Sequence, residues 1–210
     1  MDTNDMMRWV PGSVGVSEVY AFNDKTRHPW FAPAGLSRGR INAVQAERKL
    51  LNSVRDTLYV NRINPIATYP GQGVCVWGQK TLQKKPSAFD RINVRRLFLA
   101  LERPTKKAAQ FFVFEPNTEF TRTRLVNVLT PIFERAKQNQ GVYDYLIVCD
   151  ERNNTPQVID ENKLRVDIYL KPVRTAEFIL ITFYATRTDA NFQEIVDGPG
   201  LLYEGSACLL

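Results

Sequence analysis

The residues that could do chemistry are few and scattered along this 210-residue chain. Its one histidine, His28, precedes a proline, whereas a zinc site needs three or four clustered ligands. The cysteines Cys75, Cys149 and Cys208 lie far apart, and the first two fall in apolar runs that are typical of buried thiols. Cys149 could act as a nucleophile only beside an activating base, and the sequence marks none. We therefore predict no catalytic residue, no metal site and no cofactor.

The stretch "YPGQGVCVWG" at residues 69–78 is the one candidate for a nucleotide-binding loop. A dinucleotide fingerprint needs a strand before its glycines, a third glycine and then a helix. Here the apolar run Val74–Trp77 follows the glycines, and Val76 stands where the third glycine should be. The order instead predicts a turn, in which Gly71 or Gly73 supplies a positive φ or a close backbone approach before a buried strand.

The segment from Lys80 to Lys107 has nine basic residues against two acidic ones, in a chain of net charge +6. Within this segment we predict a helix from Ser87 to about Leu101. Pro104 should kink or end this helix, because proline lacks the N–H and clashes with the preceding turn. On a helical wheel the apolar residues share one side. The basic residues of the other side are Arg91, Arg95, Arg96, Arg103, Lys106 and Lys107.

Two interpretations of this basic face stay open. It could be a solvated surface that keeps the protein soluble, or a surface for an acidic partner, either a protein or a nucleic acid. Aromatic residues are not interleaved with the charges, so a base-stacking platform is not evident.

Hydrophobic periodicity and turn residues indicate an α/β or α+β domain, with one mixed sheet flanked by helices and with extended arms at both ends. No apolar run reaches the ~18–20 residues of a membrane helix, and the acidic N-terminus lacks a secretory signal. The predicted helices lie within 37–59, 87–101 and 117–138, the last containing Pro131, and the predicted strands are 14–20, 74–77, 145–149, 164–170 and 178–186.

Five motifs then occur in one order, and the similarity that they carry spans residues 14–192. They are "HPWFAPAG" (28–35), "NRINPIATYPGQGVCVWGQKTL" (61–82), "RINVRRLFLALE" (91–102), "FEPN" (114–117) and "VCDERNNTPQVIDENKLRVDIYLKPVRTAEFILI" (148–181). In these motifs the sequence resembles the C-terminal domain of contractile phage tail sheath proteins, most closely those of T4-like myoviruses. The resemblance implies a structural subunit without an active site, which polymerises around a tail tube and contracts to drive it through the host envelope for DNA ejection.

The resemblance also implies an organisation and a set of partners. We expect an N-terminal extended segment (1–22), a sheath core domain (23–187) and a C-terminal tail (188–210), in a chain that is either a fragment or an unusually small sheath. The implied partners are other sheath subunits in a helical stack of hexameric rings, the tail tube protein, and the baseplate and tail terminator proteins. The implied location is the virion tail, with the host cytoplasm during assembly. Membrane insertion and nucleic acid are not expected, and a basic nucleic-acid-binding domain is the alternative function.

Two sets of residues carry these expected contacts. In the family, extended arms add strands to the sheets of neighbouring subunits, and charged groups contact the tube. The tube-facing basic surface would comprise Arg91, Arg95, Arg96, Lys106 and Lys107. The inter-subunit strand candidates are Val166, Ile168, Leu170, Phe178, Leu180 and Thr182.

Overall fold

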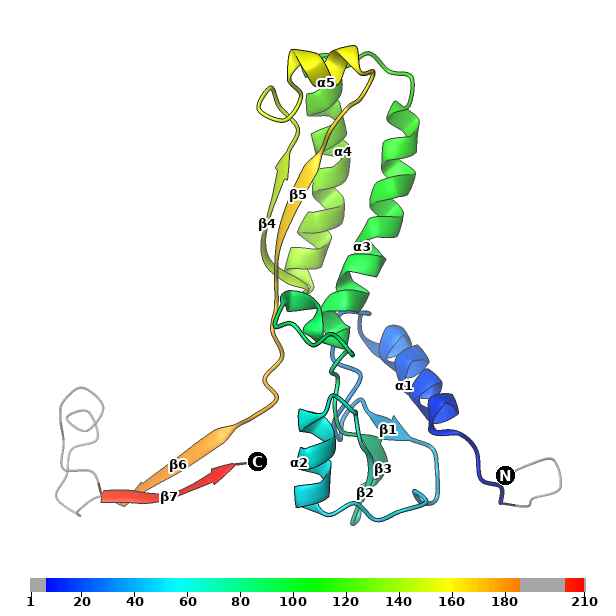
Figure 1. Ribbon diagram of the computed structural model, residues 1–210, viewed down its shortest axis with the longest axis vertical. Helices are drawn as coiled ribbons and strands as arrows, with labels where there is room; N and C mark the ends of the chain where they lie inside the picture. The colour runs from blue at the N-terminus through cyan, green and yellow to red at the C-terminus, as the bar shows by residue number, and fades with distance from the viewer. Residues whose placement is uncertain (1–6, 186–202, 210) are drawn as a thin grey trace. The chain divides into compact units, whose positions relative to one another are not determined.

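The structure is a computed structural model that describes residues 7–185 and 203–209 (Figure 1). Its contacts divide the chain into two compact units, Met1–Arg174 and Thr175–Leu210. Helices combine with small antiparallel sheets, which confirms the α+β class. Within the described ranges, no helix is long and apolar enough to cross a lipid bilayer. The domain boundaries after residues 22 and 187 stay a prediction.

The first unit begins with helix α1 (Gly12–Thr26), where the sequence had predicted a strand over 14–20. That prediction is wrong because the helical spacing of its buried residues, Gly15, Val19 and Asn23, outweighs the short alternation of apolar residues. Gly15 lets α1 lie close to the sheet, since a Cβ there would come within 2.7 Å of the Ile41 Cγ2 atom.

A three-stranded antiparallel sheet packs against α1. Its order is β1 (Arg40–Ile41), β3 (Gly73–Val76) and β2 (Ile66–Tyr69), and helix α2 (Asn52–Val60) precedes β2. Of the helix predicted within 37–59, only the last third, from Asn52, therefore forms. The turn between β2 and β3 has Gly71 at φ 73° and Gly73 at φ 84°, which confirms the structural role predicted for these glycines. The buried residues of this small core are Val19, Ile41, Val74 and Val76.

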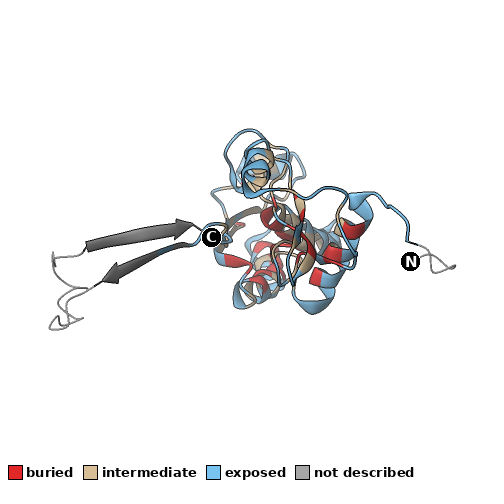
Figure 2. Cartoon of the chain, turned by 90° about the horizontal axis from the view of Figure 1, so that it is seen from below, coloured by how far each residue is buried: buried red, intermediate tan, exposed pale blue. Residues whose placement is uncertain are grey.

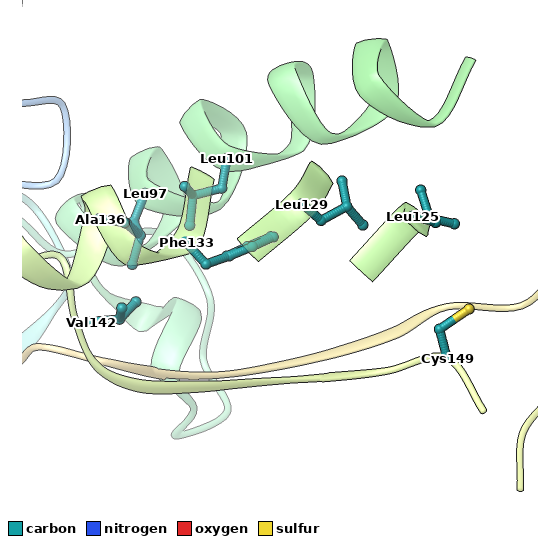
Figure 3. Packing of buried hydrophobic residues seen from close by; sticks show 8 residues of the cluster. All are labelled: Leu97, Leu101, Leu125, Leu129, Phe133, Ala136, Val142 and Cys149. Atoms are coloured by element: carbon teal, nitrogen blue, oxygen red, sulfur yellow. The ribbon is translucent and has the colours of Figure 1, made fainter. Parts of the chain in front are cut away.

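The larger core lies between two long helices and a β-hairpin (Figure 3). A 3₁₀ turn, η1 (Ala88–Asp90), leads into α3 (Ile92–Ala109), and a second one, η2 (Gln110–Phe112), follows it. Helix α4 (Glu119–Gln138) packs beside α3, and strands β4 (Val142–Val148) and β5 (Asp167–Pro172) cover α4. The buried residues are Leu97, Leu101, Leu125, Leu129, Phe133, Ala136, Val142 and Cys149. Figure 2 shows the buried residues gathered between the elements of this unit.

A capping side chain begins helix α4, and each of the two long helices contains a proline. Thr118 caps α4, because its Oγ1 accepts a hydrogen bond from the Thr121 N–H. Pro131 lies inside α4, as predicted. Pro104 does not end α3, which continues for five residues beyond it to Ala109. Of the two outcomes predicted at Pro104, a kink or an end of the helix, the end does not occur, because tertiary packing of α3 outweighs one lost hydrogen bond.

The strands form three separate sheets rather than the single mixed sheet expected from the sequence. All the pairings in the described residues are antiparallel: β1–β3–β2, β4–β5, and β6 (Leu180–Ala185) with β7 (Tyr203–Leu209). A parallel sheet needs each crossover to return to the same sheet, whereas here α3 and α4 connect strands of different sheets. The pair β6–β7 is the sheet of the second unit.

A buried asparagine holds the connection between β4 and β5. Asn154 is 2% exposed; its Oδ1 accepts hydrogen bonds from the Arg165 backbone N–H (2.8 Å) and Asn117 Nδ2 (3.3 Å). Its Nδ2 donates to the carbonyl oxygens of Asp150 (3.2 Å) and Arg165 (2.9 Å). One amide side chain therefore joins the start of α4 to both ends of the connection, which contains the short helix α5 (Pro156–Asp160).

We expect Asn154→Ala to lower the free energy of unfolding by about 2–4 kcal/mol, because it leaves several buried donors and acceptors without partners. Urea unfolding measures this change. The matched control is Asn127→Ala on the exposed side of α4, which should stay within about 0.5 kcal/mol of the parent chain. Equal midpoints for the two variants would contradict the role of Asn154.

Candidate interaction surfaces

The side chains that could take part in chemistry are buried or stacked on neighbouring side chains. Cys75 and Cys149 are buried, and burial raises the pKa of both thiols, so neither is held as a reactive thiolate. The His28 ring stacks on Trp30, with ring centroids 4.6 Å apart and 11° between planes. Over the described ranges, no group of three or more His, Cys, Asp and Glu side chains could hold a metal ion.

Helix α3 buries the apolar side that the helical wheel predicted, through Val94, Leu97 and Leu101. Of the five residues expected on the basic surface, Arg96 turns toward α1. Its Nη2 atom donates to both carboxylate oxygens of Asp24, at 2.6 and 2.7 Å. The Arg96 guanidinium also lies 4.8 Å from the Tyr20 ring centroid. Burial raises the pKa of the Tyr20 hydroxyl. Arg96 therefore binds α3 to α1 within the chain.

The other four basic residues lie at or near the surface. Arg95 is exposed, with its guanidinium 6.0 Å from the Phe89 ring centroid, and Lys107 is exposed in the last turn of α3. Lys106 pairs with Glu102 at 2.6 Å, but its side chain is 74% exposed. The Lys106 ammonium lowers the pKa of the Glu102 carboxyl. Arg91 pairs with Asp90 at 3.0 Å and is 28% exposed. An exposed ion pair such as Lys106–Glu102 contributes little to stability, so Lys106 can exchange partners at little cost.

The sequence could not predict the partner of Arg96, because the segment that carries Tyr20 and Asp24 was interpreted as extended or as a turn. The signal that could have found it is the spacing of Gly15, Val19 and Asn23, which defines a helix with one buried side. Tyr20 and Asp24, four residues apart, lie together on the neighbouring strip of that helix.

The strand candidates separate into two groups. In β5, Ile168 pairs with Ile147 and Leu170 pairs with Tyr145, and these side chains pack on the large core; Val166 also packs there but precedes the strand. Around β6, Leu180 pairs with Leu209 and Thr182 with Ala207 of β7. Phe178 precedes β6 and is 67% exposed. The first group is thus part of the unit's own packing, and the second belongs to a separate pair of strands.

The pair β6–β7 has little to stabilise it from within. Each strand has one neighbour among the described residues, so the outer edge of each lacks a ladder partner there. Ahead of β6, Phe178 and Ile179 are 67% and 56% exposed. An isolated two-stranded sheet is marginally stable in water, and an open strand edge is a template for another strand. This arrangement fits a sheet that other chains complete.

Comparisons with known proteins agree with this geometry. Residues 84–186 match the family model of the phage tail sheath C-terminal domain. The tail sheath protein of Vibrio phage KVP40 is 42% identical over 194 residues, which cover 92% of this chain and 29% of that protein. The chain spans less than a third of the length of the curated relatives it matches.

Two solved structures share the fold. The first is the baseplate of the anti-feeding prophage, with a TM-score of 0.76 and 30% identity over 84% of this chain and 51% of that one. The second is the helical sheath of the same prophage in its contracted state, with a TM-score of 0.74 and 30% identity over 82% of this chain and 50% of that one. The fold is therefore that of a subunit from a contractile sheath. More narrowly, the chain belongs to the phage tail sheath family, and residues 84–186 form the C-terminal domain.

We expect Arg96→Glu to lower the free energy of unfolding by about 1–3 kcal/mol, since it places a carboxylate against Asp24. The neighbouring reversal Arg95→Glu should change stability by no more than about 0.5 kcal/mol, because Arg95 is exposed. Adding Asp24→Lys to the Arg96→Glu chain should restore part of the loss. Chemical unfolding of the three variants measures these effects, and equal destabilisation by the two arginine variants would rule out the α1–α3 pairing.

Proposed function

We propose that this chain is the part of a contractile phage tail sheath subunit that polymerises around the tail tube. Contraction of such a sheath drives the tube through the host cell envelope and permits DNA ejection. The observation that carries this proposal is the two-stranded sheet β6–β7, whose outer edges lack a ladder partner in the described part of the chain, which belongs to the phage tail sheath family. The role is structural, without an active site of its own.

Strand addition at β6–β7 would connect neighbouring subunits. Backbone hydrogen bonds of a ladder do not depend on which side chains face outward, so they can persist while subunits rotate and slide. Among the six candidates, Phe178, Leu180 and Thr182 fit this role best. Val166, Ile168 and Leu170 belong to the segment that covers α4, where their side chains already contact the core.

Four of the five basic residues expected to face the tube remain candidates for that contact. Arg91, Arg95, Lys106 and Lys107 lie where a second protein could reach them, whereas Arg96 is committed to Asp24. Weak charge pairs suit a contact that must be released during contraction, provided that the contact repeats over many subunits. The partners would then be other sheath subunits, the tube protein, and the baseplate and tail terminator proteins at the ends.

The location that follows is the virion tail, with assembly in the host cytoplasm. The relatives described above are sheath and baseplate proteins, and nothing in them favours the nucleic-acid-binding alternative.

We expect the concentrated purified chain to form rings or helical tubes, with or without added tail tubes, in negative-stain electron microscopy. The reason is that open strand edges on every copy can pair in a repeating manner. A matched variant with Thr182→Pro should stay dispersed, because proline removes a ladder N–H. Dispersed particles from the parent chain at every concentration, together with no binding to tubes, would contradict the proposal.

We expect the double variant Arg95→Glu, Lys107→Glu to bind tail tubes at least about tenfold more weakly in co-sedimentation at low salt, with a smaller loss at high salt. The control is Lys163→Glu, Lys171→Glu, which makes the same change in net charge at exposed positions away from α3. A similar loss from both variants would show that overall charge, rather than the surface of α3, governs binding.

A further inference from the structure

The chain leaves its first unit at an irregular end of the hairpin β4–β5. Strand β5 ends at Pro172, which has no N–H and so donates no hydrogen bond to β4. At the same end the register of the ladder shifts between Val142 and Asp144. The first backbone donor beyond the proline is the Val173 N–H, which donates to the Gly141 carbonyl oxygen at 3.1 Å. Few ladder hydrogen bonds therefore hold the strands together where the chain departs.

A pull on the chain beyond β5 would load the hairpin at this one end. Gly141, the residue before β4, accepts from Val173, the residue after β5, so the chain enters and leaves the hairpin side by side. Force that enters through Val173 and is resisted by the helices would separate the strands from this end, one hydrogen bond at a time. Each such bond contributes only about 0.5–1.5 kcal/mol. The ladder alone would therefore resist such a pull weakly.

A buried side chain of α3 holds the other side of Val173. Asn93 is 4% exposed and lies in the first turn of α3, one residue before the core residue Val94. Its Nδ2 atom donates a long hydrogen bond to the Val173 carbonyl oxygen, at 3.5 Å. The Val173 backbone is thus bonded to Gly141 through its N–H and to α3 through its carbonyl group.

The turn after α4 fixes the position of Gly141. Gln140 has φ 60°, and the Gly141 N–H donates to the Ala136 carbonyl oxygen at 2.8 Å, as in a Schellman motif. A Cβ on Gly141 would come within 3.1 Å of the Leu97 Cδ1 and Trp30 Cε2 atoms. Leu97 and Ala136 lie at the same end of the large core (Figure 3). The carbonyl group that accepts from Val173 is therefore held by both long helices.

We propose that Asn93 and Gly141 clamp Val173, so that a pull on the following segment passes to α3 and α4 together instead of peeling β5 from β4. The two helices share the large core, in which Leu97 and Phe133 are no more than 2% exposed, so a pull on both is resisted by many contacts at once. Asn93 acts here as a positioning residue. The inference rests on the proposed function, in which force passes between subunits through the second unit.

Single-molecule pulling of the full chain tests the clamp along two axes. Both axes use a handle at Leu99→Cys, which is 50% exposed on α3, in a chain with Cys208→Ser. The second handle is a tag at the C-terminus, which loads Val173, or a tag at the N-terminus, which bypasses it. In the parent chain we expect the first unit to open in one step on the C-terminal axis. An earlier step that releases β5 alone would overturn the proposal.

Asn93→Leu keeps the volume of the side chain and removes its donor. At constant force we expect this variant to raise the opening rate of the first unit at least about fivefold on the C-terminal axis, and less than about twofold on the N-terminal axis. Equal acceleration on both axes would assign Asn93 a general role in folding and would overturn the clamp. An unchanged rate on the C-terminal axis would overturn it as well.

The matched control is Asn23→Leu, which alters another buried asparagine. Asn23 is 0% exposed and donates to the carbonyl oxygens of His28 and Phe31, in contacts that do not include Val173. We expect this control to leave the opening rate on the C-terminal axis within about twofold of the parent chain. Acceleration equal to that of Asn93→Leu on this axis would contradict a specific role for Asn93.

Hydrogen exchange makes the comparison without applied force. In Asn93→Leu we expect the Val173 amide to exchange at least about fivefold faster than in the parent chain. The reference is the Arg165 amide, which donates to the buried Asn154 side chain near the other end of the hairpin and should exchange at an unchanged rate. Equal acceleration of both amides would show a loss of stability throughout the hairpin and would overturn the proposal.

The outcomes also distinguish this inference from the proposed function. A parent chain that assembles and binds tail tubes, but releases β5 alone in an early step, would contradict the clamp alone. A parent chain that opens in one step and responds to Asn93→Leu as expected, but neither assembles nor binds tail tubes, would contradict the proposed function alone.

Discussion

A β-sheet of two strands leaves an outer edge on each strand, and those edges must be covered, solvated or paired. The pair β4–β5 and the pair β6–β7 meet this constraint differently. One face of β4–β5 packs on α4 through residues such as Ile147 and Ile168, so helix packing makes the hairpin part of a stable unit. In the described residues, β6–β7 has no such helix and forms a separate compact unit. Judged from the described residues, the strand edges of β6–β7 are therefore well suited to pairing with other chains.

The first unit has two cores, and polar contacts join the elements that surround them. One core surrounds Leu129 and Phe133, and the other surrounds Val19 and Val74. The Arg96–Asp24 pair joins α3 to α1, and the Trp30 indole N–H donates to the Asn139 carbonyl oxygen at 2.9 Å. Directional contacts of this type fix the angle between two packed elements more closely than apolar contact does, because each has a narrow range of favourable geometry.

The parts of the fold that the sequence predicted correctly are those set by local rules. The helix predicted within 117–138 forms as α4, whose first turn Thr118 caps, and Gly71 and Gly73 form a turn because they tolerate positive φ. The errors arose where distant contacts decide the outcome. Pro104 stays inside α3 because packing on α4 holds the helix, and three sheets form because strand partners are chosen across the fold. The same limit applies to the surfaces. The spacing of the basic residues predicted a charged side of α3, but only the position of α1 shows that Arg96 pairs with Asp24.

The proposed function requires connections that survive contraction and contacts that contraction releases, and different surfaces of the chain would supply the two. In the proposed sheath, ladder hydrogen bonds between subunits at β6–β7 would not depend on side chains, so they would persist when a subunit changes its orientation. The exposed charges on α3 contribute little singly, and their sum depends on how many subunits are aligned at once. In the proposed function, a small rotation of every subunit would release the charged contacts along the tube while the strand connections would persist. Separating the two kinds of contact between different units of the chain makes this division possible, because a flat strand edge and a charged helix surface respond differently to the same rigid-body motion.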